Sequence, residues 1–381
     1  MLILAEALLI YYDGLTISQS KLISHLVELE AQLGDLSRSK VPSRIFKLPI
    51  TFNSPKETNA IKRYMETQRP YASYLPDNME FVAKNNGLEK SDLQNILTKS
   101  SLIAVSVGFF AALPLCLPVD PRERLNCPKV FASALSKDDR RAMLTKPNQM
   151  NPSRVFTPEG QVSWGGSCMA LYNVESPGGY QLTGLTIPGC DILGSKNHYS
   201  LERPWLFEDF DQLRFYQVSE VEYERQLALF HSGRYEYEIE DTVFDMAEHN
   251  RLLEETREEV KGIRERQKLA QDEMQKVEDE LMEKWTKEKA EGKIPMDKVE
   301  ALLNDPAIQK ISSPLNANVW KVTAEEGDKV GAGDVVAILE AMKLEISVKA
   351  ADGMKGKVEK LLVRPGDVVN AGDPLVLVRE G

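Results

Sequence analysis

The pattern of hydrophobic and polar positions changes along the chain, and each pattern predicts a different kind of structure. Residues 1–100 alternate short apolar runs with polar stretches, and leucines recur at helical spacing at Leu22, Leu26, Leu29 and Leu33. The mostly apolar opening MLILAEALLI contains a glutamate and has no basic leader, which favours a core segment over a signal peptide. We therefore expect a small α/β unit at the start of a multidomain α+β protein.

Residues 101–218 contain short runs of β-forming residues separated by proline and glycine. Frequent breakers between such runs favour a β-barrel or a β-sandwich. Residues 130–150, VFASALSKDDRRAMLTKPNQM, interrupt this texture with a charged, helix-compatible insert that we expect to form a surface loop. The insert is either a loop specific to this lineage or retained intron sequence.

Residues 219–305 are dense in Glu, Lys, Arg and Gln and carry a narrow apolar stripe, which predicts one long helix or two. The spacing of the stripe leaves a coiled coil as an alternative. Its short length and Gln267 on the stripe favour a charged linker helix that packs on its own chain. The apolar residues of the stripe are Leu253, Val260, Ile263, Met274, Val277 and Leu281.

Residues 306–381 contain an internal repeat, in which EEGDKVGAGDVVAIL aligns with VRPGDVVNAGDPLVLV. In each copy a Gly-Asp turn precedes a strand of alternating Val, Leu and Ile, so we expect two short sheets related by a pseudo-twofold axis. The matching pairs, at a constant offset of 39 residues, are Gly327 with Gly366, Asp328 with Asp367, Gly333 with Gly372 and Asp334 with Asp373.

The composition of the chain excludes several classes of partner. It has 381 residues and a formal net charge of -11, which opposes binding to nucleic acid or to an anionic membrane. The four cysteines form no CxxC pair, the four histidines lie far apart, and no grouping has the spacing of a metal site. No apolar run reaches the roughly 20 residues that a membrane span needs. We expect a cytoplasmic protein with reduced thiols and no metal.

Lys343 lies in the stretch EAMKLE, where the repeat predicts a tight hairpin between strands. The sequence around it, about residues 308–380, resembles the biotinyl carrier domains of biotin-dependent carboxylases, whose signature is Ala-Met-Lys. The resemblance implies an all-β flattened barrel of the biotinyl and lipoyl type in residues 306–381, with covalent biotin on Lys343 beside Ala341 and Met342. An exposed lysine suits a carrier because a tethered cofactor must reach two separate active sites. Lipoyl domains share the fold and are the alternative, but they have Asp before the lysine and Ala after it.

A second resemblance lies upstream, in GFFAALPLCLPVDPRERLNCPK and, after the insert, NPSRVFTPEGQVSWGGSCMALYNVESPGGYQLTG. Both stretches resemble the KipI-like family, also called allophanate hydrolase subunit 1. The resemblance extends over nearly residues 45–190 and implies a cyclophilin-like β-barrel. The matching residues are Gly108, Phe109, Arg124, Leu125, Pro152 through Arg154, Pro158 through Gly160, Gly165, Gly166, Tyr172, and Ser176 through Tyr180.

A KipI-like unit joined through a charged helical segment to a biotinyl carrier is the order found at the end of urea carboxylases, often within urea amidolyases. The resemblance therefore implies a component of a biotin-dependent ligase, in which KipA-like and KipI-like halves form the carboxyltransferase site that converts urea to allophanate. Such a site must orient urea, polarise its carbonyl and remove a proton. Candidate residues near the Gly-rich turns are Arg154, Glu159, Tyr172, Gly178, Gly179 and Gln181.

Each candidate also has a structural explanation: an ion pair for Arg154, a turn for Glu159, and positive φ angles for the glycines. The chain departs from the family after YQLTG, where Leu185 stands in place of the usual arginine. Any role of that arginine is missing here.

The sequence shows no ATP-binding Gly-rich loop, no biotin-carboxylase segment and no KipA-like half. We expect those parts, which would use ATP and bicarbonate, in trans or in a longer parent chain, and the biotinyl domain implies a biotin protein ligase as a further partner. Two other functions are open. One is a non-catalytic biotin carrier or scaffold, and the other is a 5-oxoprolinase-like or kinase-inhibitor subunit, which would leave the carrier domain unexplained.

Overall fold

The computed structural model describes residues 2–4, 7–10, 12–108, 110–130, 153–291, 302–341 and 344–380. The insert predicted at residues 130–150 lies outside these ranges except for its first residue. The chain divides into two compact units. The first comprises Met1–Thr58, Asp77–Ser133 and Phe156–Gln275, and the second comprises Asn59–Pro76, Ala134–Val155 and Lys276–Gly381.

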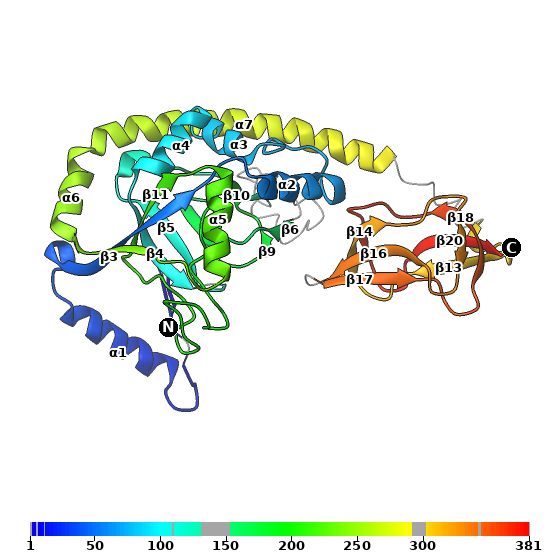
Figure 1. Ribbon diagram of the computed structural model, residues 1–381, viewed down its shortest axis with the longest axis horizontal. Coiled ribbons are helices and arrows are strands. Elements are labelled where there is room, and N and C mark those ends of the chain that lie inside the picture. The colour runs from blue at the N-terminus through cyan, green and yellow to red at the C-terminus, as the bar shows by residue number, and fades with distance from the viewer. Residues whose placement is uncertain are drawn as a thin grey trace. The chain divides into compact units, whose positions relative to one another are not determined.

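An eight-stranded mixed sheet forms the centre of the first unit, in the order β10-β7-β8-β5-β4-β11-β3-β12 (Figure 1). Neighbouring strands are antiparallel except for β11 and β3, which run parallel. Its strands are β3 (Lys40–Ile50), β4 (Leu102–Gly108), β5 (Leu113–Pro118), β7 (Gln161–Gly165), β8 (Cys168–Tyr172), β10 (Gln181–Leu185), β11 (Gln212–Gln217) and β12 (Glu238–Asp245).

The sheet curls until strands far apart in its order meet. Thr51, directly after β3, exchanges backbone hydrogen bonds of 2.9 and 3.0 Å with Leu185 at the end of β10. Leu185 is fully buried, so the residue that replaces the family arginine contributes to the core. The curl agrees with the β-barrel that the glycine and proline spacing favours, whereas its cyclophilin-like form stays a prediction.

Helices cover the sheet, and some of its strands are buried on both faces. Every residue of β7 and β10 is buried, as expected for strands covered on both sides. The helix α3 (Asn78–Lys84) packs against β10, and α4 (Lys90–Lys99) packs against β11. Two further segments are α2 (Pro55–Thr67) and the 3-10 turn η2 (Pro121–Glu123). The short strands β6 (Arg154–Thr157) and β9 (Ser176–Gly178) form a separate two-stranded sheet.

The first residues of the chain form the small strands β1 (Leu2–Leu4) and β2 (Ala7–Leu9), the helix α1 (Gln19–Gln32) and the turn η1 (Leu36–Arg38). The leucine spacing therefore predicts α1 correctly. Ser18 caps its N-terminus and accepts a hydrogen bond from the backbone N–H of Lys21. No residue of α1 is buried.

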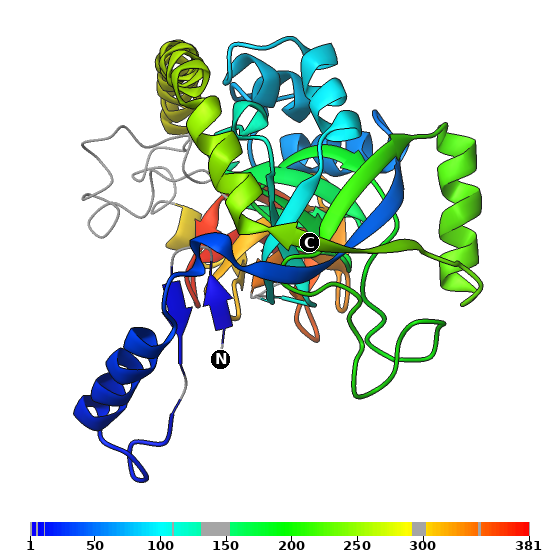
Figure 2. The same ribbon diagram turned by 90° about the vertical axis from the view of Figure 1, so that its left-hand side faces the viewer.

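Residues 219–305 are predicted to be helical. The described residues of this segment form helices and also one strand. It contains α5 (Glu220–His231), α6 (Met246–Glu255) and the long helix α7 (Arg257–Glu291), but the sequence EIEDTVFD between α5 and α6 forms the edge strand β12 beside β3 (Figures 1 and 2). The first four residues of β12 are exposed, and charged side chains suit an edge strand because they oppose further pairing. The main sheet thus extends beyond residues 101–218 on both sides, since β3 precedes and β12 follows that range.

The helix α7 packs on its own chain, as the polar residue on its stripe predicts. Gln267 is 3% exposed, and its Nε2 donates a 3.0 Å hydrogen bond to the carbonyl of Arg124. A buried side chain that satisfies a loop carbonyl fixes the rotation of the helix about its axis.

Residues 308–380 form an all-β domain of two four-stranded sheets, in the orders β13-β20-β18-β15 and β17-β16-β14-β19. Val336, Ala337 and Leu339 of one sheet and Leu375, Val376 and Val378 of the other are fully buried in its core. The strands are β13 (Ile308–Ser312), β14 (Ala317–Val322), β15 (Lys329–Gly331), β16 (Val335–Ala341), β17 (Leu344–Lys349), β18 (Lys355–Leu361), β19 (Val368–Val369) and β20 (Pro374–Glu380).

The sequence repeat is also a repeat of turns. Asp328 Oδ2 accepts the backbone N–H of Glu325 at 2.8 Å, and Asp367 Oδ2 accepts that of Arg364 at the same distance. The second pair of aspartates forms the same turn. Asp334 Oδ2 accepts the backbone N–H of Gly331 at 2.8 Å, and Asp373 Oδ2 accepts that of Asn370 at 2.7 Å. The glycine before each aspartate has a positive φ, between 84° and 100°, which favours glycine.

The two copies are also interlocked. The N–H of Gly327 donates to the carbonyl of Val358, and the N–H of Gly366 donates to the carbonyl of Val319, both at 2.8 Å. Each turn is therefore held by a strand of the other copy, and the pairs again differ by the offset of the repeat.

Candidate functional site

Several predicted site residues come together where β8, β9 and β10 follow one another. Tyr172 ends β8, Gly178 ends β9 and Gln181 begins β10. A Cβ added to Gly178 would lie 2.6 Å from the Tyr172 hydroxyl oxygen and 2.8 Å from Thr157 Oγ1, so only glycine fits there. Tyr172 and Tyr180 stack edge to face with centroids 6.4 Å apart. The close approach explains why a Gly-rich turn faces a tyrosine.

Gln181 and Gly179 hold the segment that follows η2. Gln181 is fully buried, and its Nε2 donates a 3.2 Å hydrogen bond to the carbonyl of Pro128. The carbonyl of Gly179 accepts the N–H of Val130 at 2.7 Å. Both residues thus have defined structural contacts, and their predicted contact with substrate stays a proposal.

Glu159 and Arg154 are the remaining candidate side chains. The carboxylate of Glu159, about one-third exposed, is 2.7 Å from Nε2 of His231 on α5. Glu159 therefore forms an ion pair, when His231 is protonated, at a turn in which Gly160 has a φ of +71°. Arg154 begins β6 and is 3% exposed, so a surface ion pair does not describe it.

A buried glutamate that the sequence reasoning missed lies beneath β7 and β10. Glu57 is 7% exposed, and its Oε1 accepts Nε2 of Gln161 at 2.7 Å and the N–H of Gly184 at 2.8 Å. Burial raises the pKa of Glu57 to about 7, although these hydrogen bonds and one from the Ser54 backbone oppose the rise. Because both hydrogen bonds end on Oε1, Glu57 positions β10.

The signal for Glu57 is present in the sequence. Ser54 and Glu57 have the spacing of a capping box, Ser-x-x-Glu, with Pro55 at the first position of α2. The motif predicts a helix start, but it does not reveal that strands more than a hundred residues later bury the carboxyl.

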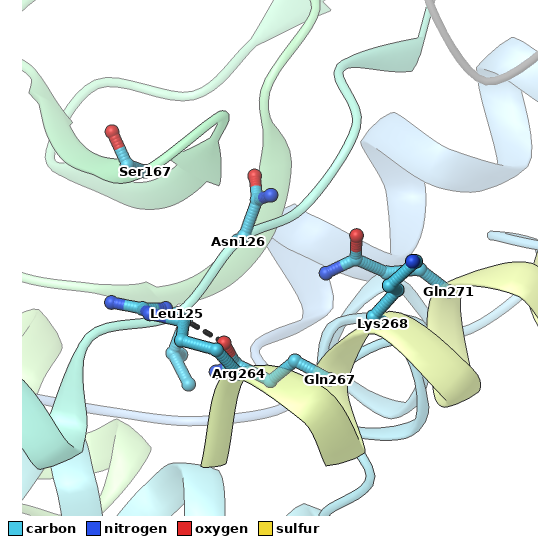
Figure 3. A pocket seen from close by; sticks show the side chains of 7 residues that line it. All are labelled: Leu125, Asn126, Ser167, Arg264, Gln267, Lys268 and Gln271. Carbon is cyan, nitrogen blue, oxygen red and sulfur yellow. Dashed lines mark hydrogen bonds between the residues drawn. The ribbon is translucent and has the colours of Figure 1, made fainter. Parts of the chain in front are cut away.

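A pocket of about 420 Å³ opens in the first unit between the segment after η2, the β7–β8 turn and α7 (Figure 3). Its only charged lining residues are Arg264 and Lys268, and Arg264 Nη1 donates to Gln267 Oε1 at 2.7 Å and to the carbonyl of Arg124 at 3.1 Å. None of the predicted catalytic residues lines it. The lining residues are Leu125, Asn126, Ser167, Arg264, Gln267, Lys268 and Gln271.

The predicted attachment residue belongs to a hairpin of the C-terminal domain. β16 and β17 are antiparallel, and Ala341 pairs with Leu344 at the end of the hairpin. Met342 and Lys343, which connect the strands in the sequence, lie outside the described residues. Ala341 packs against the domain core, whereas Leu344 is 67% exposed. One side of the hairpin end is thus anchored and the other is open to solvent.

The described residues also include the four cysteines, the possible metal ligands and the helices. Cys116, Cys127, Cys168 and Cys190 are all free thiols. Within the described ranges, no group of three or more His, Cys, Asp or Glu side chains is placed to hold a metal ion. No helix in those ranges is long and apolar enough to cross a membrane.

Two family models match the chain. One, described as carboxyltransferase domain, subdomain C and D, matches residues 2–136 and 134–195. The other, described as biotin-requiring enzyme, matches residues 306–378. Together they confirm the two resemblances noted in the sequence and the order in which they occur.

The relatives are longer proteins. A putative urea carboxylase of Emericella nidulans is 62% identical over 379 residues, which is 99% of this chain and 29% of that protein. A urea amidolyase of Saccharomyces cerevisiae is 32% identical over 379 residues, 98% of this chain and 19% of that protein. The crystal structure of Kluyveromyces lactis urea carboxylase matches with a TM-score of 0.70 and 31% identity, covering 96% of this chain and 30% of that one.

The chain thus spans less than a third of the length of these relatives. The match to the carboxyltransferase model covers about half of it, and the biotin-requiring-enzyme match covers most of the C-terminal β domain. The chain therefore belongs to the carboxyltransferase family of subdomains C and D and carries a biotin-attachment domain.

Proposed function

We propose that this chain is the carboxyltransferase and carrier portion of a urea carboxylase and that it carries biotin on Lys343. The observation that supports it most strongly is the 62% identity to a putative urea carboxylase over 99% of the chain. The hairpin of the C-terminal domain suits the attachment, because the pairing of Ala341 with Leu344 leaves only Met342 and Lys343 to connect two ordered strands. An exposed neighbour such as Leu344 leaves room for a modifying ligase and for two active sites.

Biotin, once carboxylated by parts outside this chain, supplies the carboxyl group that is transferred to a urea nitrogen. We assign to Tyr172 and Gln181 the donation of hydrogen bonds that polarise the urea carbonyl, and Arg154 stays a separate candidate. Gly178 and Gly179 would allow the backbone to approach the substrate closely. Glu159, paired with His231 and adjacent to Gly160, whose N–H donates a 2.7 Å hydrogen bond to the carbonyl of Tyr172, would act at the edge of this site.

The carrier role is tested by the intact mass of the chain co-expressed with a biotin protein ligase. We expect one biotin increment in the wild-type chain, its loss in Lys343→Arg, and its retention in Lys349→Arg, a matched change on the exposed side of β17. A lipoyl increment, or none, would contradict the proposal.

The carboxyltransferase role requires partners. The chain alone should show no ATP-dependent carboxylation of urea, and activity should appear when a biotin carboxylase and a KipA-like half are supplied. If the KipA-like half does not accelerate urea-dependent decarboxylation of carboxybiotin, the chain is a carrier or scaffold instead. ATP-dependent activity of the isolated chain would refute the proposal that this activity needs parts outside the chain.

A further inference from the structure

The pocket between the segment after η2, the β7–β8 turn and α7 carries positive charge that the described residues do not neutralise. Arg264 and Lys268 of α7 line it, and no acidic residue does (Figure 3). Neither cation has an ion-pair partner in the part of the chain that the structure describes. The chain as a whole is acidic, with a formal net charge of -11. A cationic pocket in an acidic protein favours an anionic ligand.

The two cations are four residues apart on one helix, an arrangement that costs stability unless it is compensated. Like charges at this spacing repel each other on a helix surface. At other places on α7 a cation lies beside an acid: Lys284 is 3.9 Å from Glu288, and Arg257 pairs with Glu254 just before the helix. The pocket is thus a place where the helix brings cations together without such local pairs.

A third cation next to the pocket adds to this charge. Arg124 precedes the lining residue Leu125, and burial together with the nearby Arg264 lowers the pKa of Arg124. Burial also lowers the pKa of Arg264. Asp120 attracts Arg124, but its carboxylate lies 2.7 Å from Arg122 and is shared with it. A bound anion would relieve the repulsion among the three cations.

The other polar lining residues decide which kind of anion fits. The side-chain amides of Asn126 and Gln271 line the pocket with the hydroxyl of Ser167, and neither amide is hydrogen-bonded by a described residue. Each amide has an oxygen that only accepts and a nitrogen that only donates. Phosphate or a bare carboxylate has no N–H group to offer those oxygens, whereas a carboxylate that also carries N–H groups satisfies both. The volume of about 420 Å³ lies in the range of small-molecule sites.

We propose that this pocket binds a small ureido carboxylate, with the carboxylate between Arg264 and Lys268 and the ureido group on the amides of Asn126 and Gln271. Arg264 uses only Nη1 for its bonds to Gln267 and to the Arg124 carbonyl, which leaves Nη2 and Nε for the ligand. Allophanate belongs to this chemical class, and the inference rests on the proposed function for that identification alone. Since the predicted catalytic residues do not line the pocket, it receives product that has left them.

The test measures the binding of N-carbamoylglycine, a stable ureido carboxylate, to the chain of 381 residues by isothermal titration calorimetry. We expect saturable binding that is at least about tenfold tighter than that of propionate, which lacks the ureido group, or of urea, which lacks the carboxylate. Inorganic phosphate, which has no N–H group, should also bind more weakly. The assay needs neither biotin nor a partner, so it is independent of the carrier role.

Variants locate the ligand. Lys268→Gln removes one charge and Gln271→Glu places a carboxylate beside that of the ligand, so each should weaken the binding of N-carbamoylglycine by about tenfold. Thermal unfolding of both variants without ligand should match the wild type, because neither side chain is hydrogen-bonded by a described residue. Lys276→Gln, at an exposed position of α7 outside the pocket, is the matched control and should bind like the wild type.

Three results would overturn the proposal. Equal binding by the wild type, Lys268→Gln and Gln271→Glu would place the ligand elsewhere. Phosphate or propionate that binds as tightly as N-carbamoylglycine would identify a site for simple anions. No binding of N-carbamoylglycine to a wild-type chain that accepts biotin on Lys343 would reject the pocket and leave the proposed function standing.

Discussion

The side-chain Nε2 of Gln161, the first residue of β7, donates a 2.7 Å hydrogen bond to Oε1 of Glu57. Every residue of β7 and of its neighbour β10 is buried. The same Nε2 lies 2.8 Å from the carbonyl of Gly184, and the N–H of Gly184 bonds Glu57. These contacts tie the start of α2 to both strands, so the protonation of one carboxyl affects how they are joined.

The stability of the protein should therefore depend on the titration of Glu57. Burial raises the pKa of Glu57 to about 7 from an ordinary value of 4.5, so the folded state binds the proton more tightly than the unfolded state. The free energy of unfolding then falls as the pH rises between these values. Between pH 5 and pH 8 the wild type should lose roughly 2 to 3 kcal/mol more than Glu57→Gln. Urea denaturation across this range measures the difference.

The control for this experiment is Glu224→Gln, a change at a half-exposed carboxyl on α5. Its pH profile should run parallel to that of the wild type. If the pH profile of Glu57→Gln also runs parallel to that of the wild type, the Glu57 carboxyl does not titrate in this range. The buried contacts would then hold its charged form.

Gly178 and Tyr172 should be energetically coupled. Gly178→Ala places a methyl group 2.6 Å from the Tyr172 hydroxyl oxygen and should destabilise the protein by about 1 to 3 kcal/mol. Removing that oxygen with Tyr172→Phe relieves part of the clash, so the double variant should be at least about 0.5 kcal/mol more stable than the sum of the single changes. Thermal or urea unfolding of the four proteins gives the coupling.

Gly331→Ala is the matched control, because its added Cβ would lie 3.8 Å from the nearest atom. It should combine additively with Tyr172→Phe. Additive behaviour of Gly178→Ala as well would show that the turn moves away from Tyr172.

The packing of α7 should depend on Gln267. Gln267→Met removes the hydrogen bond to the Arg124 carbonyl at a buried position and should cost about 1 to 3 kcal/mol. Gln271→Met, on the same wall of the pocket, should cost much less, because Gln271 is only partly buried. Hydrogen exchange along α7 distinguishes the two, and equal exchange in both variants would mean that Gln267 does not hold the helix.

The aspartate turns of the C-terminal domain should be equivalent. Asp328→Ala and Asp367→Ala each remove one acceptor for a backbone N–H, so each should destabilise the domain by about 1 kcal/mol. Asp352→Ala, in the connection between β17 and β18, serves as the control and should have little effect. Unequal costs in a thermal unfolding series would show that the repeat is not energetically symmetric.

Local signals explain what could be predicted from the sequence. The Gly-Asp turns recur at fixed spacing and form equivalent hydrogen bonds, and the leucine spacing predicts α1, because both depend on neighbours a few residues away. Gln267 likewise marks a helix that packs on its own chain.

The features that the sequence did not predict depend on partners that lie far away in the chain. β12 reads as part of a charged helix because its strand character comes from pairing with β3, about 200 residues earlier in the chain. Glu57 is buried by strands that follow it by more than 100 residues, and Glu159 is held by His231 on a later helix. Spacing within a motif carries no information about such contacts.

The hydrogen bonds that Gly327 donates to Val358 and that Gly366 donates to Val319 have a consequence for biosynthesis. Neither copy can close its turn until the other has been made, and β20, the last strand, pairs with both β13 and β18. The domain should therefore fold only when its final residues have left the ribosome, although Lys343 emerges well before them. A ligase that recognises the folded hairpin would then modify only chains in which β20 has been made, so that products truncated within this domain stay unlabelled.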